Sequence, residues 1–377
     1  MQKNKLRVAF FGDDFSRQGK GTALFVQKIA EELVARHSHE VEVILLRPEG
    51  QCNSVICSSV RHHIISRCFS TLLSYAWFFI THRDEYDAIV FNRVVYPFFW
   101  LLRAKKKIVF IHDASRSELY RAPRSVANRS FEYFLRFVGQ YFIDVAIAVS
   151  EDAKKWIVEY YALPPEKVHT IYPAAGDEYR RMDAHEREVA AVLLATSYSI
   201  KTPYILDVSR FDPHKNILTM LEAFFATKRA HAIPHTLILV GGPHTADYSA
   251  IVERAIATSE FREDVIVLDY VVQEDMSALY NCADMLVFPS LIEGFGLPVI
   301  EAMKCGIPVI TSNISCLPEV AGGAALLVNP ASADSISRGI QTLSSDRKLR
   351  EELVEKGLRR ATDFSWAKSA SEFTALI

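Results

Sequence analysis

Short apolar runs alternate with segments of helical periodicity along the whole chain. The first apolar run, Lys5–Phe11, is followed by Ala23–Ala35, in which apolar residues recur at helical spacing. Further runs that we expect to form buried strands are Val41–Leu46, Ala88–Phe91, Lys107–Ile111, Val145–Val149, His169–Tyr172, Tyr204–Val208, Thr236–Val240, Val265–Leu268, Met285–Phe288, Pro308–Thr311 and Ala325–Val328. Near-continuous apolar strands separated by helical patterns indicate parallel sheets that are covered by helices on both faces.

Two such blocks follow one another, which predicts an α/β protein with two Rossmann-like domains that face each other across a cleft. The first block covers residues 1–180 and the second covers residues 181–362. The segment Arg180–Thr202 is polar and charged at first, and we interpret it as the connection. Because such sheets bind ligands outside the carboxyl ends of their strands, the cleft is the expected site.

The composition is that of a soluble globular enzyme. The 377 residues are 50% hydrophobic and 23% charged, and the six cysteines include no CxxC pair, which favours a reducing compartment over a disulfide framework or a zinc site. Met1–Phe11 is interpreted as a first strand and not as a signal peptide. The longest apolar stretch, near Thr71–Ile80, is too short for a membrane-spanning helix.

Charge is divided unevenly along the chain, although the net charge is only −2 and gives no argument for nucleic acid. Residues 1–150 hold 21 Lys and Arg against 14 Asp and Glu, whereas residues 151–377 hold 22 against 31. This division predicts that the first half meets an anionic partner. Scattered, solvated charge explains the same counts equally well.

Residues 61–80 and 91–139 combine aromatic side chains with many arginines and lysines. Basic residues beside exposed aromatic ones are typical of proteins that dock on an anionic bilayer. In the alternative interpretation the aromatic residues belong to the core and the basic residues form a solvated face.

The strongest local signal runs from Ser290 to Met303 and follows a predicted strand. Gly294 and Gly296 allow close approach of the backbone to a ligand, and Pro298 stands where a helix is expected to begin. The amide groups of Phe295, Gly296 and Leu297 then point out of a helix N-terminus, which is a favourable site for an anion.

Two carboxylates flank this anion site. Glu293 precedes the predicted helix, and Glu301 lies about one turn inside it. Because an ionised carboxylate accepts several O–H hydrogen bonds, both suit hydroxyl-rich groups. A phosphate between two hydroxyl-rich groups describes a nucleotide sugar, whereas a glycine-rich turn with two solvated glutamates is the alternative.

A second signal, Asp207–Asn216, follows the first strand of the second block. Arg210 and Lys215 lie in one loop at the carboxyl end of that strand, so both are expected to converge on one diphosphate. In isolation, two exposed loop cations explain the pattern as well.

The first strand leads into a glycine-containing loop with Gly19, Lys20 and Gly21. Its spacing matches neither a P-loop nor G-x-G-x-x-G, so it gives little support to ATP or NAD binding. His112 is singled out only because it follows the predicted strand Lys107–Ile111. No D-x-D pair occurs, which argues against a divalent ion and for neutralisation of the phosphates by cationic side chains and a helix N-terminus.

Together these motifs resemble those of the retaining glycosyltransferases of family 4, which have the GT-B fold. The spacing Glu293-x7-Glu301 matches the E-x7-E signature of that family. Further matching segments are GFGLPVIEAMKCGIPVITSN (294–313), SRFDPHKN (209–216), LVGGP (239–243), YNCADMLVFPS (280–290), the HD step (112–113) and AVSEDAKKWI (148–157). The resemblance is dense over residues 204–330 and loose over residues 40–140. In that family the last helix crosses back to the N-terminal domain, which implies that residues 363–377 join the first domain.

The resemblance implies a division of roles in binding a nucleotide-diphosphate sugar. Glu301 would bind the ribose hydroxyls and Glu293 the hydroxyls of the donor sugar. The diphosphate would be held by Arg210 and Lys215 with the backbone of Gly294, Phe295, Gly296 and Leu297, and the base would be met by Tyr270 and Val271. Gly19, Lys20, Gly21 and His112 would approach the transferred sugar and the acceptor.

Such enzymes retain the anomeric configuration without a metal or other cofactor, and attack from the front face is the favoured mechanism. Where the family often has Asn-Gly-Val-Asp, this chain has Pro173-Ala-Ala-Gly176-Asp177, which leaves open any donor contact from that segment. The resemblance extends to bacterial O-antigen, capsule and lipopolysaccharide mannosyltransferases. It therefore suggests GDP-mannose as donor, a lipid-linked or polysaccharide acceptor, and a cytoplasmic enzyme on the inner face of the membrane.

Several alternatives stay open on the sequence alone. A UDP-sugar donor fits the same motifs. A nucleotide-sugar 2-epimerase with a related fold is disfavoured by the E-x7-E match and by the SRFDPHKN loop. A non-catalytic partner subunit would be expected to lack Glu293, Arg210 or Lys215, and all three are present.

Overall fold

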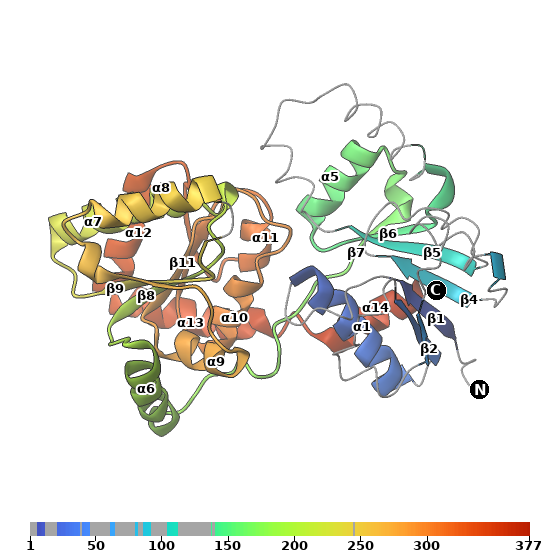
Figure 1. The fold of residues 1–377 in the computed structure, drawn as a ribbon, viewed down its shortest axis with the longest axis horizontal. Coiled ribbons are helices and arrows are strands. Elements are labelled where there is room, and N and C mark those ends of the chain that lie inside the picture. Colours follow the sequence, from blue (N-terminus) through green and yellow to red (C-terminus); the bar gives the residue numbers. More distant parts are fainter. Residues whose placement is uncertain are drawn as a thin grey trace. The chain divides into compact units, whose positions relative to one another are not determined.

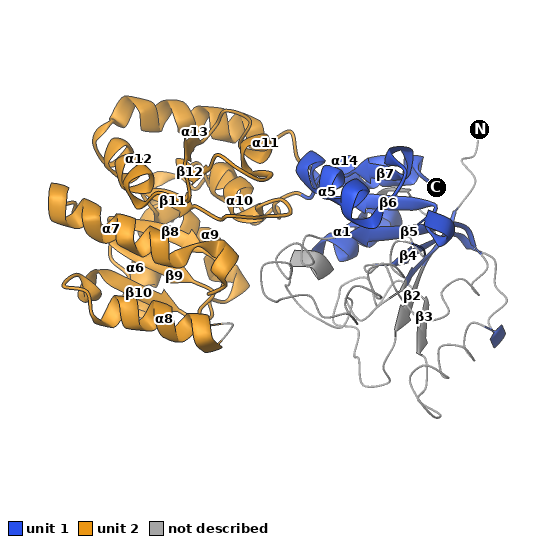
Figure 2. Ribbon diagram, turned by 90° about the horizontal axis from the view of Figure 1, so that it is seen from above, with its two compact units in different colours: residues 1–173, 365–377 blue, residues 174–364 orange. Residues whose placement is uncertain are grey.

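A computed structural model describes residues 6–11, 21–37, 40–45, 61–64, 80–81, 86–91, 104–111, 137, 140–243 and 246–377. The chain divides into two compact units, residues 1–173 with 365–377 and residues 174–364, which Figure 2 shows in different colours. Residues 174–180, which the sequence analysis assigned to the first domain, lie in the second unit. Within the described part of the chain, no helix is both long enough and apolar enough to cross a membrane.

Unit 1 contains a parallel sheet. Its described strands are β1 (Arg7–Phe11), β2 (Glu40–Leu45), β3 (Arg61–Ile64), β4 (Tyr86–Phe91), β5 (Ala104–Ile111), β6 (Val145–Ala148) and β7 (Val168–Thr170), in the order β3-β2-β1-β4-β5-β6-β7. The chain leaves β1 toward β2 on one side, and later strands extend the sheet on the other, so the topological switch point lies between β1 and β4. Strand β3 was not predicted, because its sequence RHHI is polar and lies at the sheet edge.

The described helices of unit 1 include α1 (Gly21–His37), α5 (Glu151–Tyr161) and α14 (Trp366–Ala375). Although α14 comes from the C-terminus, it packs on this unit: the Phe373 ring lies 6.3 Å from that of Phe10 in β1 and 5.9 Å from that of Phe110 in β5. The ring of Trp366 lies 5.6 Å from Phe25 of α1. The expected return of the last helix to the first domain is therefore confirmed.

Unit 2 is built on a second parallel sheet. Its described strands are β8 (Tyr204–Val208), β9 (Thr236–Val240), β10 (Val265–Leu268), β11 (Met285–Phe288), β12 (Val309–Ser312) and β13 (Leu326–Val328), in the order β10-β9-β8-β11-β12-β13. The switch point lies between β8 and β11. The two sequence motifs with candidate chemistry follow these two neighbouring strands, which is where a doubly wound sheet binds its ligand.

Helices cover both faces of this sheet (Figure 1). They are α6 (Ala184–Tyr198), α7 (Ile217–His231), α8 (Ala246–Ala257), α9 (Gln273–Cys282), α10 (Leu297–Cys305), α11 (Leu317–Ala321), α12 (Ala333–Ser345) and α13 (Arg347–Ala361). A core of buried aliphatic and aromatic residues joins β8, β9 and β11 to α7 and α12 and includes Phe224, Leu239, Val287 and Ile340.

The interpretation of Arg180–Thr202 as a plain connection is wrong, because most of it forms helix α6. The helix begins with a capping box: the Asp183 carboxylate accepts from the amide of Glu186 at 2.8 Å, and the Glu186 carboxylate accepts from the amide of Asp183 at 2.9 Å. The exposed face of α6 is unusually apolar, with Val189 and Val192 exposed. This weakens the helical periodicity that would have revealed the helix.

Candidate active site

The loops that follow β8 and β11 are fastened to one another. Asn216, with φ +63°, ends the short 3₁₀ turn Pro213–Lys215 (η5), and its side-chain amide donates to the carbonyl of Pro289 at 3.1 Å and to that of Pro330 at 2.7 Å. The amide of Leu291 donates to the carbonyl of His214 at 2.8 Å. These bonds fix the position of Lys215 relative to the loop that carries Glu293.

Lys215 and Glu293 form a close ion pair. Lys215 Nζ lies 2.6 Å from Glu293 Oε1, and the two side chains are 16% and 11% exposed. The ammonium group also lies 5.3 Å from the centre of the Phe288 ring. Because Lys215 is largely withdrawn from water, its charge interacts strongly with any nearby anion. An anion that binds here must therefore compete with Glu293 for Lys215.

Arg210 has a different environment. Its guanidinium lies 3.8 Å from the buried carboxylate of Asp212, and its side chain is 53% exposed. Arg210 and Lys215 share one loop, as predicted, but each faces its own acidic partner. Their convergence on one diphosphate stays a prediction.

The N-terminus of α10 is shaped by Gly296, which caps the helix with φ +96°. The backbone angle favours glycine, and a Cβ atom at this position would lie 2.8 Å from Cδ2 of Leu317, so that side chain would also have to shift. Pro298 stands in the first turn, where a missing amide proton costs nothing. The helix therefore presents the positive end of its dipole directly after Glu293 in the chain.

Hydrogen bonds with Ser315 and Cys316 fix the loop between β11 and α10, and neither residue was predicted to have a role. The amide of Glu293 donates to Ser315 Oγ at 3.2 Å, and the thiol of Cys316 donates to the carbonyl groups of Glu293 and Phe295, both at 3.3 Å. The Phe295 ring is buried and lies 5.3 Å from that of Phe364. Of Phe295, only the backbone is therefore available to a ligand.

Glu301 is held by a buried tyrosine pair that the sequence analysis also missed. The hydroxyl of Tyr280 donates to Glu301 Oε2 at 2.6 Å, and the Tyr179 ring stands edge-on to Tyr280 at 5.6 Å. Burial raises the pKa of Glu301 to about 7, and the charge of Glu178 adds to this, whereas the Tyr280 hydrogen bond favours the ionised form. Tyr280 belongs to the segment YNCADMLVFPS, which matches the family. From the sequence, however, a tyrosine in such a segment indicates a core position and does not reveal that its hydroxyl donates to Glu301.

Tyr270 and Val271 follow β10. The Tyr270 side chain is 77% exposed and is available for stacking, whereas Val271 is buried. Gly21 is the first residue of α1. Gly19, Lys20 and His112 lie outside the described residues, as do most of residues 61–80 and 91–139.

The segment at the boundary between the units is attached to α10. Lys304, in the last turn of α10, donates to the carbonyl of Gly176 at 2.8 Å and to that of Ala175 at 3.4 Å. Its ammonium group also lies 3.4 Å from the carboxylate of Asp177. The segment in which this chain departs from the family pattern is therefore bound to the helix that carries Glu301.

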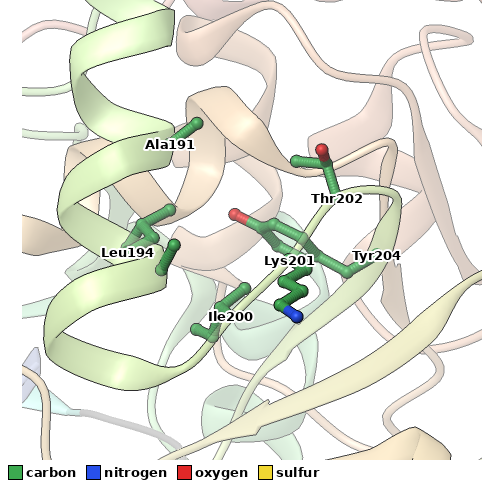
Figure 3. Close-up of a pocket in the computed structure, with 7 residues that line it drawn as sticks. Ala191, Leu194, Ile200, Lys201, Thr202 and Tyr204 are labelled. Atoms are coloured by element: carbon green, nitrogen blue, oxygen red, sulfur yellow. The ribbon is translucent and has the colours of Figure 1, made fainter.

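A pocket of about 210 Å³ lies elsewhere in unit 2 and is not part of this site (Figure 3). It is lined by residues of α6 and of the segment that leads into β8, including Leu194, Ile200 and Tyr204. Because Tyr204 is the first residue of β8 and Ile200 precedes it, the pocket lies at the amino end of this strand, whereas Lys215 follows its carboxyl end.

Comparisons with known proteins agree with this architecture. The family described as Glycosyltransferase Family 4 matches residues 19–177, and Glycosyl transferases group 1 matches residues 198–360. The structure is similar to HepE from Anabaena in complex with UDP-glucose (TM-score 0.79, 18% identity, 99% of this chain and 100% of that one) and to sucrose-phosphate synthase from Thermosynechococcus elongatus (TM-score 0.77, 19% identity, 99% and 98%). The fold is therefore GT-B.

Curated relatives include the serotype-specific mannosyltransferase WbdA of Escherichia coli, 30% identical over 60% of this chain and 28% of the relative. The O-antigen chain mannosyltransferase B of Escherichia coli is 32% identical over 60% of this chain and 58% of the relative. The matches thus span from about a quarter to somewhat over half of these relatives. The chain belongs to the glycosyltransferases of family 4.

Proposed function

We propose that the chain transfers a sugar from a nucleotide-diphosphate sugar to a glycan acceptor with retention of anomeric configuration. The carrying observation is the Lys215–Glu293 ion pair, placed beside the N-terminus of α10 at the switch point of the unit 2 sheet. A cation and a helix N-terminus suit the diphosphate, and the carboxylates of Glu293 and Glu301, which precede and follow that N-terminus in the chain, suit the hydroxyls of the sugar and the ribose.

Each described group has a role in this proposal. Glu301, oriented by Tyr280, accepts hydrogen bonds from the ribose hydroxyls. The diphosphate displaces Glu293 from Lys215, and the released carboxylate then accepts hydrogen bonds from the donor sugar. Arg210 and the first turn of α10 complete the diphosphate site, and Tyr270 with the backbone at Val271 meets the base.

The proposed mechanism is attack of the acceptor hydroxyl from the face that the leaving diphosphate vacates. The bond between the anomeric carbon and the phosphate oxygen breaks as the new glycosidic bond forms, and the leaving phosphate takes the acceptor's proton. Lys215, Arg210 and the α10 N-terminus stabilise the charge that develops on the diphosphate, so no metal ion is needed. Positioning and electrostatic stabilisation then supply most of the catalysis.

The proposed donor is GDP-mannose, and the proposed acceptor is a lipid-linked or polysaccharide intermediate of O-antigen, capsule or lipopolysaccharide synthesis. The names of the curated relatives, a serotype-specific mannosyltransferase and an O-antigen chain mannosyltransferase, support mannose and an O-antigen acceptor. The excess of basic residues in residues 1–150 supports docking on the inner face of the cytoplasmic membrane. Binding to anionic vesicles that weakens at high salt would support docking, and absence of binding would refute it.

A thermal-shift screen against GDP, UDP, ADP, dTDP and their common sugars, without metal, tests the donor. Stabilisation by GDP and GDP-mannose is the expected result, because a ligand that binds only the folded state raises its melting temperature. Stabilisation by the UDP series instead would keep the mechanism and discard mannose. No shift with any nucleotide sugar would refute the proposed donor site.

A further inference from the structure

Asp207 is an acidic side chain inside the unit 2 core, and the mechanism above leaves it without a role. It is the fourth residue of β8 and is fully buried. The hydroxyl of Ser209 donates to Oδ1. Among the described residues, no group reaches Oδ2 with a hydrogen bond. A buried carboxylate with a single donor is poorly compensated, so its ionised form is less stable here than in water and its pKa is raised.

Asp207 is nevertheless close enough to the candidate active site to respond to its charges. The charges that couple to this carboxyl are those of Lys215 in η5, the turn that follows β8, and of Glu293 in the loop before α10. From α8, the neutral hydroxyl of Tyr248 is also coupled to Asp207: burial raises its pKa, and the Asp207 charge adds to this. The Lys215 charge favours ionisation but is already paired with Glu293 at 2.6 Å, and the Glu293 charge opposes ionisation. Burial is the largest effect, and it raises the pKa of Asp207 to about 7.

We propose that Asp207 takes up a proton from solvent when the diphosphate of the donor binds beside Lys215. The inference rests on the proposed function. Bound diphosphate adds negative charge to a region that already holds Glu293 and withdraws Lys215 from both carboxylates. Ionised Asp207 is then repelled without compensation, whereas the neutral acid is not. Asp207 thereby makes donor affinity fall as the pH rises above neutrality.

Glu301 gives donor binding the opposite pH dependence. Ribose hydroxyls donate hydrogen bonds to its carboxylate, so donor binding favours the ionised form and releases a proton. Its pKa is also raised to about 7. The two effects oppose each other in the wild-type protein, and removal of one acid exposes the other.

The test is calorimetric titration of the nucleotide sugar that stabilises the protein, at about pH 7, in two buffers that differ in ionisation enthalpy. A nucleotide sugar is the proper probe because its diphosphate, unlike that of a free nucleoside diphosphate, does not titrate near neutrality. Asp207→Asn is expected to shift the net proton exchange toward release by up to about half a proton. It should bind like wild type at about pH 6 and up to about tenfold more tightly at about pH 8.

Two further variants make the result interpretable. Asp334→Asn, an exposed acid on α12, should exchange protons like wild type. Ser209→Ala keeps the carboxyl group but removes the donor to Oδ1, so proton uptake should persist with its midpoint at higher pH; this variant also serves if Asp207→Asn does not fold. Equal proton exchange and equal pH dependence in wild type and Asp207→Asn would overturn the inference. Failure of every nucleotide sugar to bind would instead refute the proposed function, and the inference with it.

Discussion

The Tyr280–Glu301 hydrogen bond gives the sharpest mutational prediction. Tyr280→Phe removes one buried hydroxyl that donates to Glu301 at 2.6 Å and leaves the ring, with its edge-on contact to Tyr179, in place. A hydrogen bond to a charged group contributes about 1.5–3 kcal/mol, which corresponds to roughly one to two pKa units. Because the hydroxyl favours the ionised carboxylate, its loss raises the pKa of Glu301 from about 7 to roughly 8–9.

At neutral pH the ionised fraction of Glu301 then falls from about a half to between roughly one per cent and a tenth. We expect the KM for the nucleotide sugar to rise about fivefold or more at about pH 7 and to recover at higher pH, while kcat at saturating donor changes little. Steady-state kinetics from about pH 6 to 9 measure this directly.

Tyr204→Phe is the matched control, because the Tyr204 hydroxyl is equally buried and donates at 2.6 Å to the backbone carbonyl of Leu279. This variant should lose comparable stability without a change in the pH dependence of KM. A Tyr280→Phe enzyme whose pH profile matches that of wild type would refute the role given to this hydroxyl.

Three further predictions concern the site and the sheet beneath it. Arg210→Ala should lower kcat at least tenfold, because charge on the leaving diphosphate loses a compensating cation; unchanged kcat would remove Arg210 from the diphosphate site. Glu293→Gln should lower turnover strongly while GDP binds at least as tightly as before, since Lys215 no longer has a competing partner; parallel loss of both would contradict a sugar-facing role. His235 donates to Asp284 at 2.9 Å, and this hydrogen bond lowers the pKa of the Asp284 carboxyl. The bond therefore stabilises the folded protein at pH values above the ordinary aspartate pKa, and this stabilisation is lost as the pH falls through the lowered pKa. Asp284→Asn should therefore cost about 1 kcal/mol of unfolding free energy at neutral pH, with a smaller loss in strong acid, measured by urea titration.

The strands of unit 2 followed closely from the sequence. Tyr204–Val208 and Met285–Phe288 form strands with the predicted bounds, because strands buried on both faces are nearly continuous in apolar residues, Asp207 being the exception here, and are bounded by polar turns. Helix α6 was missed because its apolar residues lie on its exposed face as well as on its buried one.

The motifs placed Lys215 and Glu293 at the carboxyl ends of two strands but predicted neither that these strands are neighbours nor that the two side chains form an ion pair. Such a contact depends on bonds between loops, above all those of Asn216, that no local pattern encodes. The contacts of the buried polar residues around the site could not be predicted for the same reason. Tyr280 and Asp207 stand in the core, where a polar residue is noticeable but its partner cannot be identified from spacing.

In the proposed function, unit 2 holds the diphosphate of a sugar nucleotide through Lys215, without a metal ion. Titration of GDP-mannose and UDP-glucose in the presence of EDTA, into wild type and Lys215→Ala, tests it most directly. Lys228→Ala serves as the control, because Lys228 is also largely buried in unit 2 but pairs with Asp264 at 3.0 Å, away from the site. We predict saturable binding of one of these donors to wild type and to the control, and binding at least about tenfold weaker to Lys215→Ala. Equal affinity in all three proteins, or binding that requires a divalent ion, would refute a metal-free diphosphate site at Lys215.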